Sequence, residues 1–238
     1  MSELTLNFMD LHEIDITPNA VQPTWARIAE GIEDADPSNN DNVDQTPYLS
    51  GEGHGTSTVI GMQKTISFTG HRYVGDAAQD YIASIQNHLS KGRETKYRYT
   101  DADGTKLTAP CTIANIDIGG GGADAKKDLS FEVHLNGKPA ETPRAPAEEL
   151  GTTVTAGSTE GTTTFTASPE GDNTLAYRLL PQSAGVIYGG QYIEGTIAYT
   201  AEDEIVASEG QYLQMFELDA NKRVAKFNEH ELVALDIG

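Results

Sequence analysis

Cysteine, basic residues and long apolar runs are all scarce in this sequence of 238 residues. Cys111 is the only cysteine, so no disulfide can form within the chain. The N-terminal stretch MSELTLNFMDLHEID has neither a basic region nor an apolar core, so we expect no signal peptide. No run approaches the roughly 18 apolar residues of a membrane-spanning helix, and we expect no membrane partner.

Acidic residues outnumber basic ones by 36 to 16, which gives a net charge of −20. Binding to nucleic acid through counterion release needs clustered Lys and Arg, so this balance argues against a protein that grips DNA or RNA. It suits a surface along which DNA moves without sticking. The first 60 residues are especially acidic, because they contain eleven Asp and Glu residues and only one basic residue, Arg27.

Motifs for catalysis, phosphate binding and metal binding are also missing. The glycine run Gly119–Gly122 leads into Ala123 and a further strand, whereas a phosphate loop continues with Lys-Ser/Thr and a helix. Ser57 lacks the surroundings of a nucleophile elbow, and the six histidines form no metal-binding pair. The aspartates of the early acidic stretch, Asp34, Asp36, Asp41 and Asp44, lack the spacing of a calcium loop. We therefore expect no enzyme, no metal site and no cofactor.

The remaining pattern is mainly β, in two blocks. Residues 1–137 form the first predicted domain, residues 138–150 an exposed linker rich in Pro and Glu, and residues 151–238 a small all-β sandwich of the Ig-like type. In the first block we expect short strands at residues 4–8, 11–16 and 25–32. Residues 33–58 are polar and rich in Gly, Pro and Asn, and they predict a long loop without regular structure.

The rest of the first block alternates between strands and one helix. Met62–Arg72 has period two, with Ile66 and Phe68 on one face and polar residues on the other. Asp76–Leu89 has apolar residues three and four apart, which predicts an amphipathic helix. Further strands are predicted at residues 94–100, 106–118 and 127–136, and the last of these also alternates between apolar and polar residues.

The stretch ISFTGHRYVGDAAQDYI, residues 66–82, carries a family resemblance. A strand that ends near Gly-Arg is followed by Gly-Asp and a helix, as Gly70, Arg72, Gly75 and Asp76 are placed here. Together with WARI, the long polar loop and the later strands about a Gly-rich loop, this order resembles the tail tube, or major tail, protein of long-tailed bacteriophages. The second block is similar to the β-sandwich domain that some of these proteins carry at the C-terminus.

The resemblance implies a structural virion protein rather than an enzyme. Copies would form homohexameric rings that stack into the tail tube, and four strands of each copy would join a continuous β-barrel around the channel for genome ejection. Its implied partners are further copies of itself, a tape measure protein inside the tube, and tail terminator and baseplate or distal tail proteins at the ends. DNA would pass without specific binding, and the tail would be assembled in the host cytoplasm.

Three sets of residues follow as hypotheses on this basis. The lumen-facing set contains the polar positions of two alternating strands: Gln63, Thr65, Ser67, Thr69, His71, Asp128, Ser130, Glu132 and His134. The inter-ring loop set contains Glu33, Asp34, Asp36, Asp41, Asp44, Tyr48 and Glu52. The subunit-interface helix set contains Asp76, Tyr81, Ile82 and Ile85. The alternative for the first set is that it faces outside solvent.

Other functions fit the same composition. The main alternative is a surface-adhesion or carbohydrate-binding β module, for which Tyr188 and Tyr192 in VIYGGQYIEG are the only aromatic hint. A secreted enzyme on a β scaffold would need a signal peptide and a catalytic motif. A tail terminator or head–tail connector would stop at one ring and would seldom carry the second domain.

Overall fold

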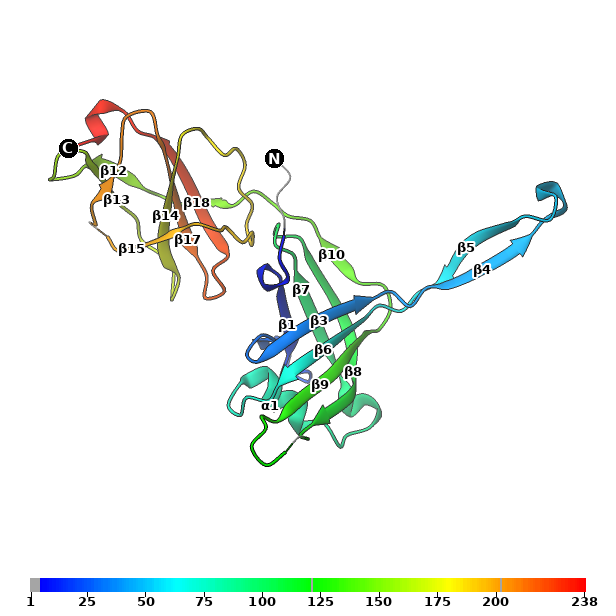
Figure 1. Ribbon diagram of the computed structural model, residues 1–238. Helices are drawn as coiled ribbons and strands as arrows, with labels where there is room; N and C mark the ends of the chain where they lie inside the picture. Colours follow the sequence, from blue (N-terminus) through cyan, green and yellow to red (C-terminus); the bar gives the residue numbers. More distant parts are fainter. Residues whose placement is uncertain (1–4, 121, 202) are drawn as a thin grey trace. The chain divides into compact units, whose positions relative to one another are not determined.

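The computed structural model describes residues 5–120, 122–201 and 203–238, and it is mainly β, as the sequence predicts (Figure 1). The single α-helix of these residues is α1 (Ala77–Ser84). The short 3₁₀ helices are η1 (Asn7–Met9), η2 (Leu49–Gly51), η3 (Ser90–Arg93) and η4 (Ala234–Asp236). The chain divides into two compact units. We call residues 11–99 and 107–141 the sheet unit, and residues 5–10, 100–106 and 142–238 the terminal unit.

The sheet unit is built on one large sheet with the strand order β2-β1-β7-β8-β9-β6-β3, to which β10 is added along β8. Its strands are β1 (Leu11–Asp15), β2 (Trp25–Arg27), β3 (Ile32–Ser38), β6 (Thr65–His71), β7 (Glu94–Thr100), β8 (Lys106–Ile118), β9 (Asp128–Leu135) and β10 (Ala140–Thr142). The strands predicted at residues 62–72, 94–100, 106–118 and 127–136 are therefore confirmed. Among the described residues, β2 and β3 are the two end strands of this order.

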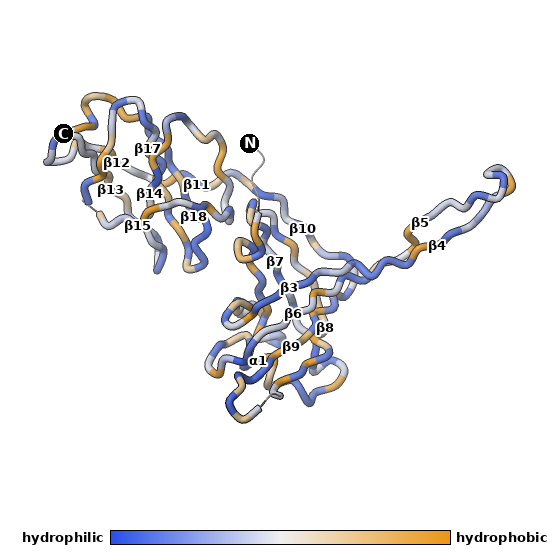
Figure 2. The backbone as a smooth tube through the Cα atoms, in the orientation of Figure 1, coloured by the Kyte–Doolittle hydropathy of each residue, from blue (hydrophilic) through white to orange (hydrophobic). Residues whose placement is uncertain are grey.

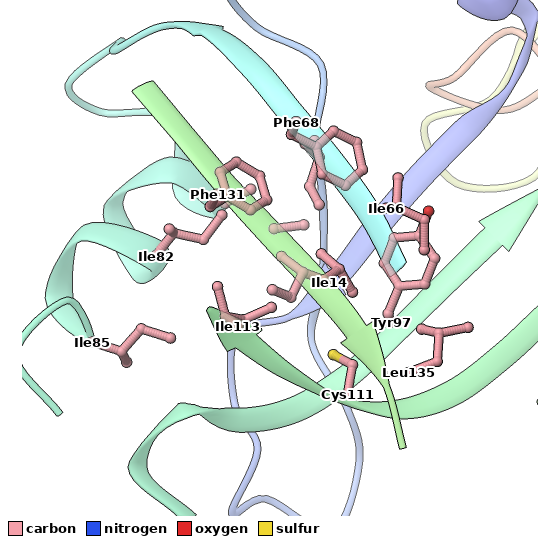
Figure 3. Packing of buried hydrophobic residues seen from close by; sticks show 14 of the residues in the cluster. Ile14, Ile66, Phe68, Ile82, Ile85, Tyr97, Cys111, Ile113, Phe131 and Leu135 are labelled. Carbon is pink, nitrogen blue, oxygen red and sulfur yellow. The ribbon is translucent and has the colours of Figure 1, made fainter. Parts of the chain in front are cut away.

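Alternating apolar residues of these strands form a single core under the sheet. The buried members include Ile66 and Phe68 of β6, Leu129, Phe131, Val133 and Leu135 of β9, Cys111 and Ile113 of β8, Ile14 of β1 and Tyr97 of β7 (Figure 3). The rings of Phe68 and Phe131 stack with centroids 5.0 Å apart. Each such side chain contributes about 1.5–3 kcal/mol on burial, so the alternating pattern fixes which face of the sheet is inside.

The helix is shorter than the sequence predicts. Asp76 is the N-cap, and its side chain accepts a hydrogen bond from the Gln79 amide, as expected. The helix ends at Ser84, however, and Leu89 is 82 % exposed instead of packing on the core. Arg93 donates hydrogen bonds to the carbonyls of Gln86 and His88, which follow the helix. A further helical turn would otherwise pair such carbonyls with backbone amides.

Three predictions for the first 60 residues need correction. Leu4 lies outside the described residues, and the rest of the strand predicted at 4–8 is replaced in part by η1. The strand predicted at 25–32 is β2 followed by a turn at Gly31, whose φ of +68° lies in the left-handed region. Residues 33–58 are not an irregular loop, because they contain most of β3, all of β4 (Asn42–Pro47) and part of β5 (Gly55–Gly61). In β4 and β5 both faces are exposed, so hydropathy shows no period of two, and on the core side of β3 only Ile32 and Ala35 are apolar.

β4 and β5 form a two-stranded sheet of their own, and we call residues 41–62 the arm (Figure 1). Val43 pairs with Val59 and Thr46 with Thr56, while η2 lies at the tip. Almost every residue of the arm is exposed on both faces. An isolated two-stranded ribbon is only marginally stable in water, so the arm lacks the support that the core gives to the other strands.

The terminal unit contains a small β-sandwich. Its five-stranded sheet has the order β11-β18-β17-β14-β15, and its three-stranded sheet has the order β12-β13-β16. The strands are β11 (Glu148–Glu149), β12 (Thr153–Ala156), β13 (Thr162–Thr166), β14 (Thr174–Leu180), β15 (Ile197–Tyr199), β16 (Ile205–Val206), β17 (Tyr212–Leu218) and β18 (Val224–Glu231). Both sheets contribute to one core, in which Phe165 and Tyr199 stack with centroids 3.9 Å apart.

The segment predicted as a linker is mostly exposed, except for the buried Leu150, and it takes part in both units. β10 lies at its start and pairs with β8, whereas β11 pairs in parallel with β18. Pro146 forms a β-bridge with Tyr188. The terminal unit also includes residues 5–10 and 100–106, so it is not made only of residues that follow the segment.

Candidate assembly surfaces

The predicted lumen-facing residues come together on one face of the sheet. In the β6–β9 pair, Thr65 lies opposite His134, Ser67 opposite Glu132, Thr69 opposite Ser130, and His71 opposite Asp128. Opposite residues of antiparallel strands point to the same side, and the other side of both strands is the buried core. Eight of the nine residues therefore share the face away from the core. Thr65 is nevertheless buried, with 6 % of its surface exposed, whereas Gln63 lies just before β6 and is exposed.

Two more strands extend this face. Asp34 and Asp36 of β3 lie opposite Thr69 and Ser67, while Asp117 of β8 lies opposite Ser130. We call the outward side of β3, β6, β9 and β8 the polar face. Asp34 and Asp36 belong to it, although the sequence placed them in a loop, and Asp117 was missed altogether. The run EDADPS could have revealed β3, because Asp34 and Asp36 alternate with Ala35, which packs against the core.

The polar face is acidic, and both of its histidines lie beside carboxylates. His71 lies 3.3 Å from a carboxylate oxygen of Glu33 and 3.6 Å from one of Asp128. His134 Nε2 lies 2.8 Å from Glu132, and its Nδ1 lies 3.4 Å from the Thr65 hydroxyl. Lys and Arg take no part in the described pairs across β6 and β9. Such a surface offers hydrogen bonds to water and little attraction for phosphate.

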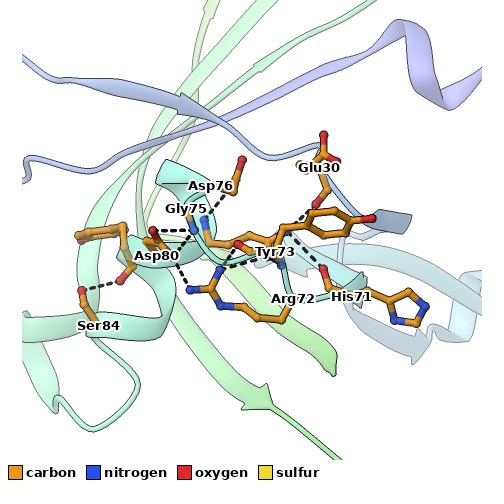
Figure 4. Close-up of polar contacts among 10 residues, drawn as sticks. Glu30, His71, Arg72, Tyr73, Gly75, Asp76, Asp80 and Ser84 are labelled. Atoms are coloured by element: carbon orange, nitrogen blue, oxygen red, sulfur yellow. Dashed lines mark hydrogen bonds and ion pairs between the residues drawn. The ribbon is translucent and has the colours of Figure 1, made fainter. Parts of the chain in front are cut away.

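The motif of residues 66–82 folds into a compact polar network at the start of the helix (Figure 4). The Arg72 guanidinium forms an ion pair with Asp80 and donates to the Tyr73 carbonyl. Asp80 also accepts hydrogen bonds from the Gly75 amide at 3.1 and 3.3 Å. The Arg72 hydrogen bond, followed by that of Gly75, lowers the pKa of Asp80 from its ordinary value. The network thus fixes the sharp turn between β6 and α1.

Gln79 joins this turn to the neighbouring strands. Its side chain is buried, accepts a hydrogen bond from the Tyr73 amide at 2.6 Å and donates to the carbonyls of Glu30 and His71. Gly70 lies where β6 approaches the turn before β3 so closely that a side chain would collide with Gly31. The motif residues are therefore explained by local folding of the sheet unit, which is a structural role.

The residues of the predicted interface helix mostly serve the sheet unit of their own chain. Ile82 and Ile85 are buried in the core of the sheet unit, and Asp76 caps the helix. Tyr81 is half-buried, and burial raises its pKa above the ordinary value. Ile82 and Ile85 therefore pack inside the sheet unit, and a role of this helix at a subunit interface stays a prediction.

The predicted inter-ring loop residues separate into two groups. Glu33, Asp34 and Asp36 belong to β3, whereas Asp41, Asp44, Tyr48 and Glu52 belong to the arm. At the tip of the arm Leu49 is fully exposed and Tyr48 is 57 % exposed. Figure 2 shows the arm as mainly hydrophilic, with hydrophobic colour at the tip and toward the base. Exposed apolar residues on an unsupported ribbon indicate a contact surface.

The aromatic residues expected for a carbohydrate-binding module are engaged within the terminal unit. The Arg144 guanidinium lies 4.2 Å from the ring centroid of Tyr188, and the Phe8 ring packs edge-on against Tyr192 at 5.9 Å. In the part of the chain that the structure describes, no group of three or more His, Cys, Asp or Glu side chains could hold a metal ion. No helix of the described residues is long and apolar enough to cross a membrane.

Comparisons with known proteins give partial similarities. The family model of the S-layer protein SbsC C-terminal domain matches residues 155–234. The tail of an empty gene transfer agent (GTA) particle with C6 symmetry is 16 % identical, with 59 % of this chain and 100 % of that chain covered and a TM-score of 0.48. The virion of a native GTA particle is 18 % identical, with the same coverage and a TM-score of 0.46.

A crystal structure of domains 7, 8 and 9 of the S-layer protein SbsC is 14 % identical, with 90 % of this chain and 66 % of that chain covered and a TM-score of 0.34. No curated protein matches the chain.

Proposed function

We propose that the chain is a structural subunit of a phage-type tail tube, in which hexameric rings stack around a channel for DNA. The polar face carries the proposal. One side of β3, β6, β9 and β8 is a closed apolar core, and the other side is an acidic, polar surface. Strands of this kind can line a water-filled channel once neighbouring copies close the sheet into a barrel.

The terminal position of β3 supports closure by a second copy. An edge strand presents unpaired backbone groups, and pairing with a neighbouring subunit removes that edge. Pro37 and the acidic residues of β3 are features by which an edge strand avoids unspecific pairing. In a ring, the lumen-facing set together with Asp34, Asp36 and Asp117 would give an acidic wall along which DNA slides without binding.

The other parts of the chain receive roles around this wall. The arm would contact the next ring, and Tyr81 together with the exposed side of α1 would border the neighbouring subunit. The terminal unit would lie on the outer surface of the tube. The partners would be a tape measure protein in the channel and terminator and baseplate proteins at the ends, and the chain would reside in the virion after assembly in the host cytoplasm.

Negative-stain electron microscopy of the concentrated, unheated protein tests the proposal. We expect hollow tubes with a regular axial repeat and sixfold symmetry in cross-section. A variant in which residues 41–61 are replaced by an Asn-Gly turn should remain folded and form at most single rings. Discrete particles of the intact chain at every concentration, with no rings and no tubes, would contradict the proposal.

A further inference from the structure

A groove of about 730 Å³ lies at the base of the arm. It is lined by Met62, Gln63 and Lys64, which lead into β6, and by residues 135–139, which run from the last residue of β9 into the chain beyond it. Met62 is 60 % exposed, and Pro139 adds a second apolar surface. The groove is thus apolar on part of its lining, although it lies at the surface.

Two lysines give the groove a positive charge. Lys64 and Lys138 both line it, and neither side chain forms a hydrogen bond or an ion pair with the described residues. Unpaired cations beside an apolar groove favour an acidic segment that also carries apolar side chains.

The tip of the arm has that chemistry. Residues 28–63 contain no Lys or Arg, and the arm itself carries Asp41, Asp44 and Glu52. Tyr48 and Leu49 are exposed at the tip, where they begin the short helix η2 that Glu52 caps at its C-terminal end. The tip therefore offers two apolar side chains and a carboxylate to a surface that offers two lysines and an apolar lining.

The arm cannot fill the groove of its own chain. The strand from Asn42 to Pro47 is extended, and at about 3.3 Å per residue the tip lies on the order of 20 Å from the base of the ribbon. β5 returns over the same length in register with β4, so the ribbon does not fold back on itself. An arm tip that binds in this groove therefore belongs to another molecule.

We infer that the groove at the base of the arm receives the tip of the arm of a second copy of this chain. Leu49 and Tyr48 pack on the surface of Met62 and Pro139, while Glu52 approaches Lys64 and Lys138. Tip and groove are different patches, so the contact is heterologous and leads to rings or open polymers rather than to a closed dimer. In a tail tube this groove would be the site on one ring that binds the arm of the next ring, and this part of the inference rests on the proposed function.

Mixing two variants, each with one introduced cysteine, tests this contact in the full-length chain. Native Cys111 gives little background, because it is fully buried and burial raises the pKa of its thiol to about 12. The tip variant Leu49→Cys is mixed with the groove variant Pro139→Cys under mild oxidation, so that a disulfide between tip and groove can arise only between two molecules. In the matched control the groove variant is replaced by Val21→Cys, an exposed site far along the sequence from the groove residues.

We expect at least tenfold more mixed disulfide between the tip variant and the groove variant than in the control mixture. Equal yields would overturn the inference. A product dominated by disulfides between two molecules of the tip variant would also overturn it, because arms would then pair with each other in an isologous contact.

Charge reversal gives a second readout. Lys64→Glu combined with Lys138→Glu should lower the yield of the tip–groove disulfide at least tenfold, and Glu52→Lys should restore it to within about threefold of the starting value. Lys126→Glu, which reverses an exposed lysine in the loop before β9, is the control and should leave the yield unchanged. Loss without rescue by Glu52→Lys would overturn the assignment of the occupant.

Electron microscopy of the same samples separates this inference from the proposed function. Tubes that form without the tip–groove disulfide would overturn the inference and leave the tail tube proposal in place. Efficient cross-linking in particles that never form rings or tubes would support the tip–groove contact and contradict the proposed function.

Discussion

At the scale of single residues, Gly70 controls the approach of β6 to the turn before β3. A Cβ atom at this position would collide with the carbonyl oxygen of Gly31 and lie 2.8 Å from the Cα atom of Ile32. Both neighbours are backbone atoms, which cannot move aside as the end of a side chain can. The glycine of the GHR motif is thus required by packing of the main chain.

Gly70→Ala should therefore lower the free energy of unfolding by at least about 3 kcal/mol, because two backbone segments of the sheet unit must separate. Chemical denaturation monitored by circular dichroism measures this value. Gly51→Ala is the matched control, since no atom lies within 4 Å of the added Cβ and its φ is not in the left-handed region. A loss below about 1 kcal/mol for Gly70→Ala would show that the close approach is not maintained in solution.

Glu204 gives a prediction about acid. Its carboxylate accepts hydrogen bonds from the Ser158 hydroxyl and amide and from the Thr159 amide, and the pKa is lowered to about 2, with the Ser158 hydroxyl as the largest cause. A lowered pKa in the folded state means that the ionised form stabilises the fold. This contribution is complete above the ordinary pKa of 4.5 and is lost as the pH falls toward 2.

Glu204→Gln should therefore reduce the slope of unfolding free energy against pH between about 4.5 and 2, and leave it unchanged near neutrality. NMR titration of the Glu204 carboxyl carbon should give a midpoint well below 4.5. A midpoint near 4.5 would mean that the turn at Ser158 and Thr159 does not hold the carboxylate.

At the scale of elements, the strands with one apolar face could be predicted from the sequence and those without one could not. β9 was predicted because Leu129, Phe131, Val133 and Leu135 alternate toward the core. β4 and β5 were missed because neither of their faces is buried, so hydropathy carries no period there. The pairing of β6 with β9 brings the predicted lumen residues onto one face. Because the two strands are far apart in the sequence, the sequence alone does not predict which of their residues lie opposite each other.

The C-terminal end of α1 also could not be predicted from the apolar pattern. Leu89 fits the apolar spacing of α1, yet the helix stops at Ser84. Arg93 donates hydrogen bonds to the carbonyls of Gln86 and His88. The spacing of apolar residues three and four apart cannot predict these side-chain hydrogen bonds. Local spacing predicted the helix and its N-cap, while side-chain hydrogen bonds from beyond the helix determined its length.

The arm is the element whose state should change on assembly. Trypsin has no site between Arg27 and Lys64, so chymotrypsin, which cuts after Tyr48 and Leu49, is the suitable probe. We expect rapid cleavage at the tip in the dilute monomer and at least tenfold slower cleavage in the assembled protein. Mass spectrometry of the fragments locates the cut, and equal rates in both states would contradict a role of the arm in contacts between copies.

At the scale of the whole molecule, residues from both ends of the chain fold into one unit. Arg223 is only 3 % exposed, and its guanidinium donates to the carbonyls of Met9, Thr100, Asp101 and Gly190. Residues 5–10 and 100–106 are thereby joined to the β-sandwich that contains Arg223. Removal of residues 145–238 would uncover Met9 and Ala102, so the terminal unit is more than an addition after a linker.

Arg223→Leu should lower the stability of the terminal unit by about 3 kcal/mol, because several buried carbonyls lose a charged donor. The corresponding fall in Tm is on the order of 10 °C, measured by calorimetry. Arg144→Leu, which removes an exposed ion pair with Asp103 at 3.3 Å and a cation–π contact with Tyr188, is the control and should cost no more than about 1.5 kcal/mol. Equal effects of the two substitutions would contradict the structural role of Arg223.

The central claim is that the polar face lines a channel formed by many copies. A reconstruction of the assembled particle by electron cryomicroscopy tests it directly, because the side chains of Ser67, Glu132 and Asp36 can then be located relative to the axis. We predict that they point into a continuous lumen, with the core of each sheet unit behind them. A particle in which these side chains lie on the outer wall, or in which no central channel exists, would contradict the account.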